Sequence, residues 1–229
     1  MPDGLDPAEA ETLVVNGITA WQLLHRTART PRGATILVHG ANGGVGSVLV
    51  QLARAAGITV IGTASARNAD AVRALGAQWV DYTGDVPALV RELAPGGVAA
   101  VFDHIGGPGI VDSFRLLAPG GALVAYGTAA TKDTEGDSRL PVLKLLARLA
   151  LWNALPNRRR AHFYNLWAGK RNAAAFRTRI ADDLGRVFAL AVAGEVRGQV
   201  AARLPLAEAA AALRLAESRT VVGKVVLEP

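Results

Sequence analysis

Short apolar runs alternate along this chain with longer segments in which apolar residues recur at every third or fourth position. Runs rich in β-branched residues are typical of strands that are buried on both faces of a parallel sheet. They predict strands at Thr35–His39, Ile58–Gly62, Trp79–Tyr82, Val98–His104 and Ala122–Tyr126. The periodic segments between them predict crossover helices. We therefore expect an α/β protein with a doubly wound Rossmann fold, strand order 3-2-1-4-5 and right-handed connections.

Further elements are predicted on both sides of this unit. Asp6 as N-cap and Pro7 at the first helical position begin a helical segment over residues 7–28. The aromatic run His162–Trp167 predicts a sixth strand at the edge of a mostly parallel six-stranded sheet with helices on both faces. Helices are also expected at Asn68–Leu75, Val86–Leu93, Ile110–Leu117, Pro141–Leu155, Ala173–Ala193 and Leu206–Glu217, and strands at Gln199–Leu204 and Gly223–Leu227. Residues 131–137 are polar and predict a loop.

The turn after the first predicted strand has the sequence Ala41-Asn42-Gly43-Gly44-Val45-Gly46, an A-x-G-x-x-G pattern. Gly43 allows the backbone to approach a pyrophosphate closely, and Gly46 allows the following helix to pack tightly on the strand. The N–H groups of the first helical turn attract a negatively charged ligand. Because strand, turn, helix and strand follow one another, the pattern predicts a dinucleotide site that includes Asn42, Gly43, Gly44 and Val45. The alternative is a tight turn in an unrelated α/β protein.

The end of the second strand indicates which dinucleotide binds. An NAD site uses an acidic residue there to bind the ribose hydroxyls. This chain has no Asp or Glu between Thr59 and Ala69, and instead offers Ser65 and Arg67. Arginine remains charged and presents a fork of donors that suits a 2′-phosphate, so NADPH is expected rather than NADH. The alternative for Arg67 is a solvated residue of the next helical turn.

Composition excludes several classes of protein. The 229 residues contain no cysteine, which excludes disulfides and thiolate chemistry and is compatible with a cytoplasmic location. The acidic N-terminus is unlike a signal peptide. The net charge of +6 is concentrated partly at Arg158–Arg160, but no nucleic-acid-binding motif accompanies it, so nucleic acid is not an expected partner. The histidines lack metal-ligand spacing, and no metal is expected.

Several motifs together resemble one family: HGANGGVGSVLVQLARAAG, GTAS, VFDHIGG, LAPGGALVAYG and VVGKVVLEP. They are similar to the medium-chain dehydrogenase/reductase superfamily and, within it, to the zinc-independent quinone oxidoreductases of the zeta-crystallin and VAT-1-like type. Members of this family begin with a GroES-like lobe, and this chain starts where the family's chain leaves that lobe, either as a truncated piece or as a natural short form. The resemblance therefore implies a NADP-binding Rossmann domain over residues 1–195, with an inserted helix near 141–155. Residues 196–229 would form a segment that in the family packs on the GroES-like lobe, and the strand Gly223–Leu227 would pair with another chain.

The resemblance also implies additional contacts and a reaction. Thr19 matches a residue near the nicotinamide, Tyr82 one beside the adenosine phosphate, and His104 one that faces the cofactor from a strand end. Tyr126 and Gly127 match the loop beneath the nicotinamide ribose. The implied reaction is direct hydride transfer from NADPH to a quinone or enone without a metal, and no catalytic residue is assigned. For Tyr82 and His104 the alternatives are a strand-end aromatic residue and a loop histidine.

The sequence lacks the motifs of several other enzyme classes. The chain lacks the Tyr-x-x-x-Lys of short-chain dehydrogenases, the lysine of a P-loop and the Gly-x-Ser-x-Gly of a hydrolase. A different class of function is an NADPH-binding module that dimerises and catalyses nothing. The resemblance implies a homodimer through the edge strand at 162–167. The helix Pro141–Leu155 either packs on the sheet, which is the expected arrangement, or lies on an anionic membrane.

Overall fold

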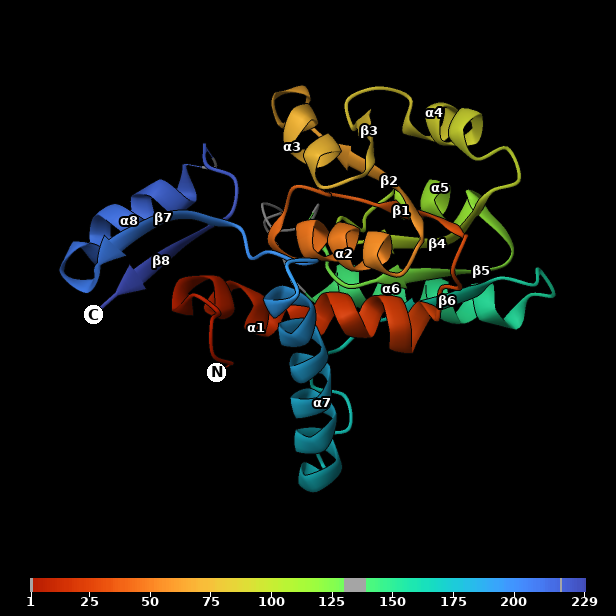
Figure 1. Ribbon diagram of the computed structural model, residues 1–229. Coiled ribbons are helices and arrows are strands. Elements are labelled where there is room, and N and C mark those ends of the chain that lie inside the picture. Colours follow the sequence, from red (N-terminus) through yellow and green to blue (C-terminus); the bar gives the residue numbers. More distant parts are fainter. Residues whose placement is uncertain (1, 130–138, 219) are drawn as a thin grey trace.

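A six-stranded parallel sheet forms the centre of the molecule, as the computed structural model shows (Figure 1). The structure describes residues 2–129, 139–218 and 220–229. The strands are β1 Thr35–Val38, β2 Thr59–Ala64, β3 Gln78–Asp81, β4 Val98–Asp103, β5 Leu117–Ala125 and β6 Arg160–Phe163. Their order, β3-β2-β1-β4-β5-β6, confirms the predicted doubly wound arrangement and the sixth strand at the edge. The predicted loop at 131–137 lies outside the described residues.

Helices cover both faces of this sheet because successive strand residues point to opposite sides. On one face Ile36 and Val38 belong to a core that also contains residues of the first helices and of the long late helix. On the other face Leu37 belongs to a second core. The first layer contains α1 Pro7–Trp21, η1 Gln22–Ala28, α2 Gly44–Ala55, α3 Ala69–Ala74 and α7 Ala173–Val192. The second contains α4 Val86–Leu93, α5 Ile110–Arg115 and α6 Arg139–Ala154.

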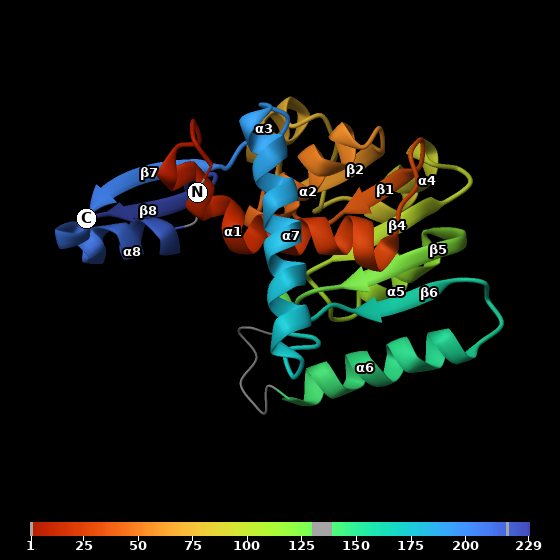
Figure 2. The same cartoon turned by 60° about the horizontal axis from the view of Figure 1, so that its bottom comes forward.

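The amphipathic helix α6 packs on the sheet, as expected. Leu145 and Leu149 are buried in the second core, and the Trp152 ring stacks on Phe114 at 4.2 Å. Figure 2 shows α6 running beside β6 at the end of the sheet. Lys144 is on the exposed side of the helix. The face with Leu145, Leu149 and Trp152 therefore packs within this molecule, whereas Leu143, Leu146 and Leu151 on the rest of α6 are exposed.

Some element boundaries differ from the predicted ones. The helix expected at Ile110–Leu117 ends at Arg115, since Leu117 already pairs with Val98 across a register shift in β5. The sixth strand ends at Phe163, and Trp167 lies in the turn that follows. The segment predicted as one helix from residue 7 changes at Gln22 into the π-helix η1.

The last residues form a small unit beside the main sheet. β7 Val200–Pro205 and β8 Lys224–Glu228 pair in parallel, and η4 Leu206–Glu208 and α8 Ala209–Glu217 connect them. Figure 1 shows this unit to the left of the sheet, next to the start of α1. Within the chain the partner of the last strand is therefore β7, and its pairing with another chain stays a prediction. The division of the chain at residue 195 stays a prediction.

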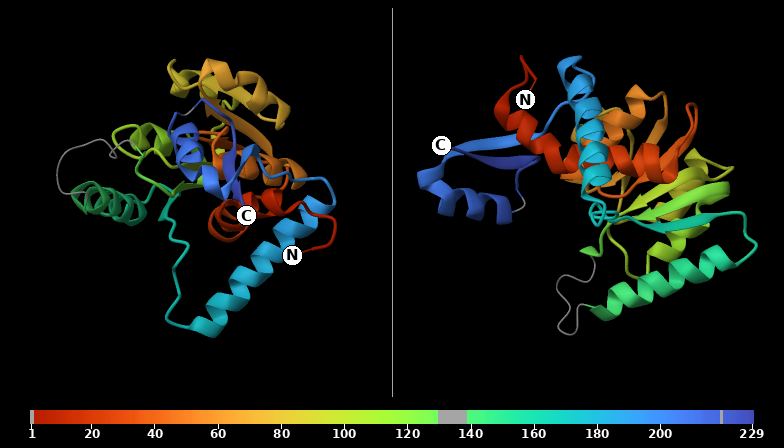
Figure 3. Two further views of the ribbon diagram at one scale, coloured as in Figure 1. Left: turned by 90° about the vertical axis from the view of Figure 1, so that its left-hand side faces the viewer. Right: turned by 90° about the horizontal axis from the view of Figure 1, so that it is seen from below.

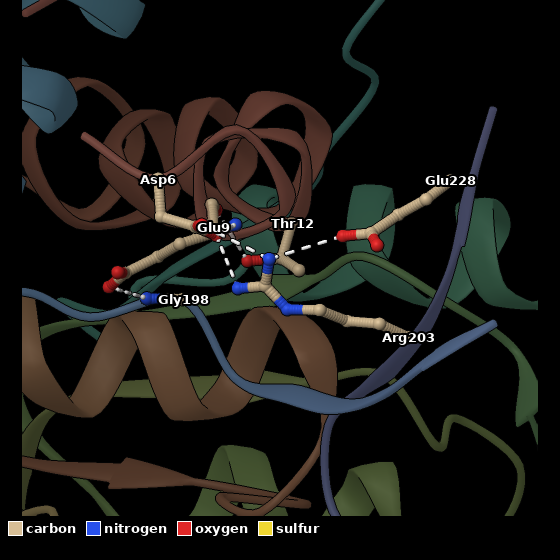
Figure 4. A network of polar contacts seen from close by, with 6 residues as sticks. All are labelled: Asp6, Glu9, Thr12, Gly198, Arg203 and Glu228. Atoms are coloured by element: carbon tan, nitrogen blue, oxygen red, sulfur yellow. Dashed lines mark hydrogen bonds and ion pairs between the residues drawn. The ribbon is translucent and has the colours of Figure 1, made fainter. Parts of the chain in front are cut away.

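Charged side chains hold this unit against the start of α1 (Figure 4). The Arg203 guanidinium donates to Asp6 at 2.6 Å and to Glu228 at 3.1 Å, so it joins β7, β8 and the N-cap of α1. The hydrogen bond from Arg203 is the main cause that lowers the pKa of Asp6. Nearby, the Glu9 carboxylate accepts from the Gly198 N–H at 2.9 Å.

Helix α7 crosses α1 and extends past the body of the molecule (Figure 3). The crossing is close at Gly17 of α1, where an added Cβ atom would lie 2.7 Å from a Val187 methyl carbon. Further along, the fully buried Asp183 accepts hydrogen bonds from Gln22 at 2.7 Å and from Arg26 at 2.8 Å. Both partners belong to η1, so α7 and the π-helix are joined by a buried charge.

Candidate cofactor-binding site

The glycine-rich turn brings α2 unusually close to the end of β1. Gly43 is the N-cap of α2, and its N–H donates to the Gly40 carbonyl at 2.9 Å. A Cβ atom at Gly43 would lie 3.2 Å from the same oxygen, and one at Gly46 would overlap with it. Gly40 itself has a φ of +65°, in the left-handed region that favours glycine. The turn therefore excludes a side chain at Gly46 and leaves little room for one at Gly43.

The first turn of α2 presents backbone donors at the carboxyl edge of the sheet. The Ser47 N–H makes the first hydrogen bond of the helix, to the Gly43 carbonyl at 2.8 Å. The N–H groups of Gly44, Val45 and Gly46 precede it and have no carbonyl one turn earlier in the helix to bind. Together with the helix dipole, they form an arrangement that suits the phosphates of a nucleotide.

A cavity of about 310 Å³ lies directly in front of these donors. It is bounded by the ends of β1, β4 and β5, where the chain leaves neighbouring strands toward opposite faces of the sheet, the usual position of ligands in open α/β sheets. Its lining includes the predicted residues Gly43, Gly44, Val45, His104, Tyr126 and Gly127, together with Gly40, Gly46, Thr128 and Ala129. The structure thus brings together residues from three segments that are far apart along the chain, the glycine-rich turn, the end of β4 and the end of β5.

His104 and Tyr126 line the cavity from the ends of β4 and β5. His104 Nδ1 lies 3.1 Å from the carbonyl oxygen of His39, and the His104 ring centroid lies 5.8 Å from that of Tyr126. Burial, followed by the negative charge of Asp103, raises the pKa of the Tyr126 phenol. Tyr126 is therefore a neutral hydrogen-bonding group at ordinary pH.

A hydrogen-bonded chain that the sequence analysis did not predict lies beneath the cavity. The Ser113 hydroxyl donates to the Asp103 carboxylate at 2.8 Å, and His39 Nε2 lies 3.1 Å from that hydroxyl oxygen. His39 Nδ1 lies 3.2 Å from the Thr63 hydroxyl, which also accepts from the Gly40 N–H at 3.2 Å. Since Ser113 uses its proton on Asp103, its oxygen can only accept from His39, and a neutral His39 ring therefore carries its proton on Nε2. Nδ1 of that ring then accepts from the Thr63 hydroxyl.

This chain fixes both loops that border the cavity. At one end the Gly40 N–H is part of the glycine-rich turn. At the other end Asp103, which is 2% exposed, also accepts from the backbone N–H groups of Ile105 and Gly106 at 2.8 and 2.9 Å. Burial lowers the pKa of His39, and the nearby His104 also lowers it, whereas Asp103 raises it. The strand-end acid in VFDH was the available sequence signal, but no pattern pointed to Ser113.

The residues predicted to select the cofactor lie at the ends of β2 and β3. Ser65 is the N-cap of η2 Ala66–Asn68, and Arg67 lies within η2. The Ser65 hydroxyl accepts from the Asn68 amide at 3.1 Å. Tyr82 is 58% exposed, and its N–H donates to the Ala64 carbonyl at 3.4 Å. Ser65 and Arg67 follow β2, next to β1, and Tyr82 follows β3, two strands from β1. All three share the carboxyl edge of the sheet with the glycine-rich turn, although they do not line its cavity.

Two predicted residues have other surroundings. Asn42 is half-buried within the glycine-rich turn and is outside the lining of the cavity. Thr19 is 7% exposed in α1 and forms a hydrogen bond with Tyr164, which partly offsets the rise that burial causes in the Tyr164 pKa. Thr19 therefore does not meet the other predicted residues in this cavity, and its role near a nicotinamide stays a prediction.

Comparisons with known proteins agree with this geometry. Residues 75–227 match a family described as zinc-binding dehydrogenase, more than half of the chain. The chain belongs to the medium-chain dehydrogenase/reductase superfamily. A 2-haloacrylate reductase from Burkholderia sp is 33% identical over 98% of this chain, which spans 64% of that protein. The solved structure of a mycobacterial quinone oxidoreductase matches with a TM-score of 0.80 and 31% identity, covering 100% of this chain and 66% of the other.

A second mycobacterial structure, complexed with NADPH, matches with a TM-score of 0.76 and 30% identity over 100% of this chain and 66% of that one. Its relatives thus include proteins described as a reductase and a quinone oxidoreductase, and one structure that was solved with NADPH. Within residues 2–129, 139–218 and 220–229, no group of three or more His, Asp or Glu side chains is placed to hold a metal ion. None of the described helices has the length and apolar character needed to cross a membrane. The cytoplasmic location stays a prediction.

Proposed function

We propose that this chain binds NADPH along the carboxyl ends of β2, β1 and β4 and serves a reductase of quinones or enones. The observation that carries the proposal is the cavity between the glycine-rich turn and the Tyr126–Gly127 loop, in front of the N-terminus of α2. When bound, NADPH would supply a hydride from C4 of its nicotinamide, without a metal. Relatives described as a quinone oxidoreductase and a 2-haloacrylate reductase support this class of reaction.

Each group of residues would have a separate task. The N–H groups of Gly44 and Val45 would bind the pyrophosphate, and Ser65 with Arg67 would bind the 2′-phosphate. Tyr126 would support the nicotinamide ribose as a neutral phenol. The hydrogen-bonded chain from Asp103 to Gly40 would keep the two walls of the cavity at a fixed separation.

Replacing Arg67 with alanine is expected to weaken NADPH binding by about tenfold or more, because a charge-assisted pair with the 2′-phosphate is lost. NADH binding should change little, since NADH lacks that phosphate. Titration of each nucleotide against protein fluorescence measures both constants, with Arg91→Ala in α4 as a control that removes an exposed arginine elsewhere. An equal loss for NADPH and NADH, or no loss for either, would contradict the role assigned to Arg67.

An NADPH-binding module without catalytic activity is the alternative. The chain spans about two thirds of the length of the relatives reported above. NADPH oxidation with a quinone or an enone separates the two functions: turnover supports the reductase, and binding without turnover supports the module. Failure to bind NADPH would contradict both.

We also propose that two copies pair through β6, the edge strand of the sheet. Phe163 on β6 is 40% exposed and Trp167 after it is 61% exposed, so the edge offers apolar surface. The Asn153 side chain already binds the Ala161 N–H and carbonyl, so the pairing would depend mainly on side chains. Light scattering should therefore give the mass of a dimer. Phe163→Arg is expected to give a monomer, whereas Leu213→Arg on the exposed face of α8 should leave the mass unchanged. A wild-type monomer at high concentration would exclude this pairing.

A further inference from the structure

A polar pocket separate from the cofactor cavity lies between η1, the end of β6 and α7. Its volume is about 220 Å³, and it shares no lining residue with the cavity at the glycine-rich turn. That volume is small for a nucleotide and sufficient for an anionic group that carries a few carbon atoms. The polar side chains that line it include Gln22, Arg26, His162, Tyr164 and Arg179.

One side of this pocket is already satisfied internally. The Arg26 guanidinium pairs with Asp183 at 2.7 Å, and that hydrogen-bonded partner raises the pKa of Arg26. The Gln22 amide donates to Asp183 at 2.7 Å and accepts from the Tyr164 hydroxyl at 3.0 Å. These side chains therefore hold each other in place, and the charge of Arg26 is balanced by carboxylates of α7.

The opposite side is not satisfied. Arg179 uses one terminal nitrogen to donate to the Ala168 carbonyl at 2.6 Å, and its guanidinium lies 5.3 Å from the centre of the Phe176 ring. Its Nε is buried, and among the described residues it has no hydrogen-bond partner. His162 Nε2 is also buried, and it too has no hydrogen-bond partner among the described residues. No carboxylate within 2–129, 139–218 or 220–229 forms an ion pair with Arg179.

A buried donor without a partner costs free energy. An oxyanion would remove that cost here, because it accepts from the Arg179 Nε–H. The neighbouring imidazole of His162 has its pKa lowered by burial and by Arg160, and in the neutral tautomer that is protonated at Nε2 it would donate to the same anion. Arginine suits such a ligand because its fork of donors matches carboxylate and phosphate oxygens.

We propose that this pocket is a binding site for a small oxyanion, a carboxylate or phosphate group, held by Arg179 and His162. The site rests on different residues from the NADPH proposal and stands independently of it. Because η1 and α7 form its walls together, occupation of the pocket would also stabilise the attachment of α7 to the body of the protein.

Nuclear magnetic resonance of the arginine Nε–H groups tests the site in the unmodified 229-residue chain. Sodium phosphate and sodium acetate are each titrated at constant ionic strength, with sodium chloride as the reference. A saturable shift of the Arg179 signal with phosphate or acetate, absent with chloride, is the expected result, and the tighter of the two anions identifies the class of ligand. No saturable shift with either anion up to tens of millimolar would overturn the proposal.

Variants separate this site from a general effect of positive charge. Arg179→Gln is expected to weaken binding of the anion by about tenfold or more. Arg177→Gln removes the same charge from an exposed position of the same helix and should leave binding unchanged. Equal losses in both variants would overturn the proposal. Circular dichroism checks folding, and if Arg179→Gln does not fold, the titration of the wild-type chain decides the question.

Discussion

Replacing Gly46 with alanine is expected to lower the free energy of unfolding by about 1–3 kcal/mol and to weaken NADPH binding by more than tenfold. The added methyl group would overlap with the Gly40 carbonyl oxygen, and it would also lie 3.1 Å from the Ala41 Cα atom. Both neighbours are backbone atoms of the glycine-rich turn and cannot rotate away. The start of α2 must therefore move away from β1, and its N–H donors move with it.

Urea unfolding and NADPH titration measure the two effects in one preparation. Gly185→Ala is the matched control, since Gly185 lies within α7 and no atom comes within 4 Å of an added Cβ. That variant should be more stable by up to about 1 kcal/mol, because alanine favours the helix, and should bind NADPH normally. If Gly46→Ala retains wild-type affinity, the close contact between α2 and the turn is not what positions the cofactor.

The sequence predicted those features of the fold that depend on neighbouring residues, and not those that depend on contacts between distant segments. Strand positions and order depended on local apolar patterns, and Gly43 and Gly46 on a contiguous motif, so both could be inferred. The end of β6 at Phe163 was missed because the aromatic run continues to Trp167, which instead stacks near Phe176 of α7 at 6.1 Å. That contact is made with a distant helix, and strand propensity carries no information about it.

The candidate site shows the same limit more clearly. The glycine-rich turn is visible in the sequence, but the chain that supports it connects His39 to Thr63 and to Ser113, 24 and 74 residues further on. Those side chains meet only because β1, β2 and β4 end at one edge of the sheet. For Thr19 a family motif suggested a cofactor contact, and that contact stays a prediction, since the structure shows its side chain beside Tyr164. The motif thus predicted the backbone turn of the site but not the buried side chains that hold the turn in place.

Replacing His39 with leucine is expected to destabilise the protein by about 2–3 kcal/mol at pH 8. Leucine leaves the Ser113 and Thr63 hydroxyls without their shared partner in a buried position, and the Gly40 turn loses the side chain that held Thr63. Ser113→Ala removes one bond from the same chain and should cost less, about 1–2 kcal/mol. Urea unfolding followed by tryptophan fluorescence gives both values.

The pH dependence of folding stability separates the contribution of the His39 imidazole from that of the neighbouring hydroxyl groups. Because burial lowers the pKa of His39 in the folded state, the unfolded chain takes up a proton first as the pH falls through about 6.5. Folding stability therefore decreases with falling pH from that point, by at most about 2 kcal/mol at pH 5, since each unit of difference is about 1.4 kcal/mol. A proton on His39 Nδ1 would also prevent that nitrogen from accepting the hydrogen bond of the Thr63 hydroxyl. The pKa values of His25 and His162 are lowered too, so part of the decrease belongs to them.

The comparison of variants isolates the contribution of His39. His39→Leu should lose less stability between pH 8 and pH 5 than the wild type does, whereas Ser113→Ala, which retains the imidazole, should lose about as much as the wild type. If His39→Leu keeps the full decrease, the titrating groups lie elsewhere and the neutral tautomer beneath the glycine-rich turn has no part in the acid sensitivity. If it loses the decrease and Ser113→Ala does not, a neutral His39 is what keeps the turn and the β4–α5 loop in place.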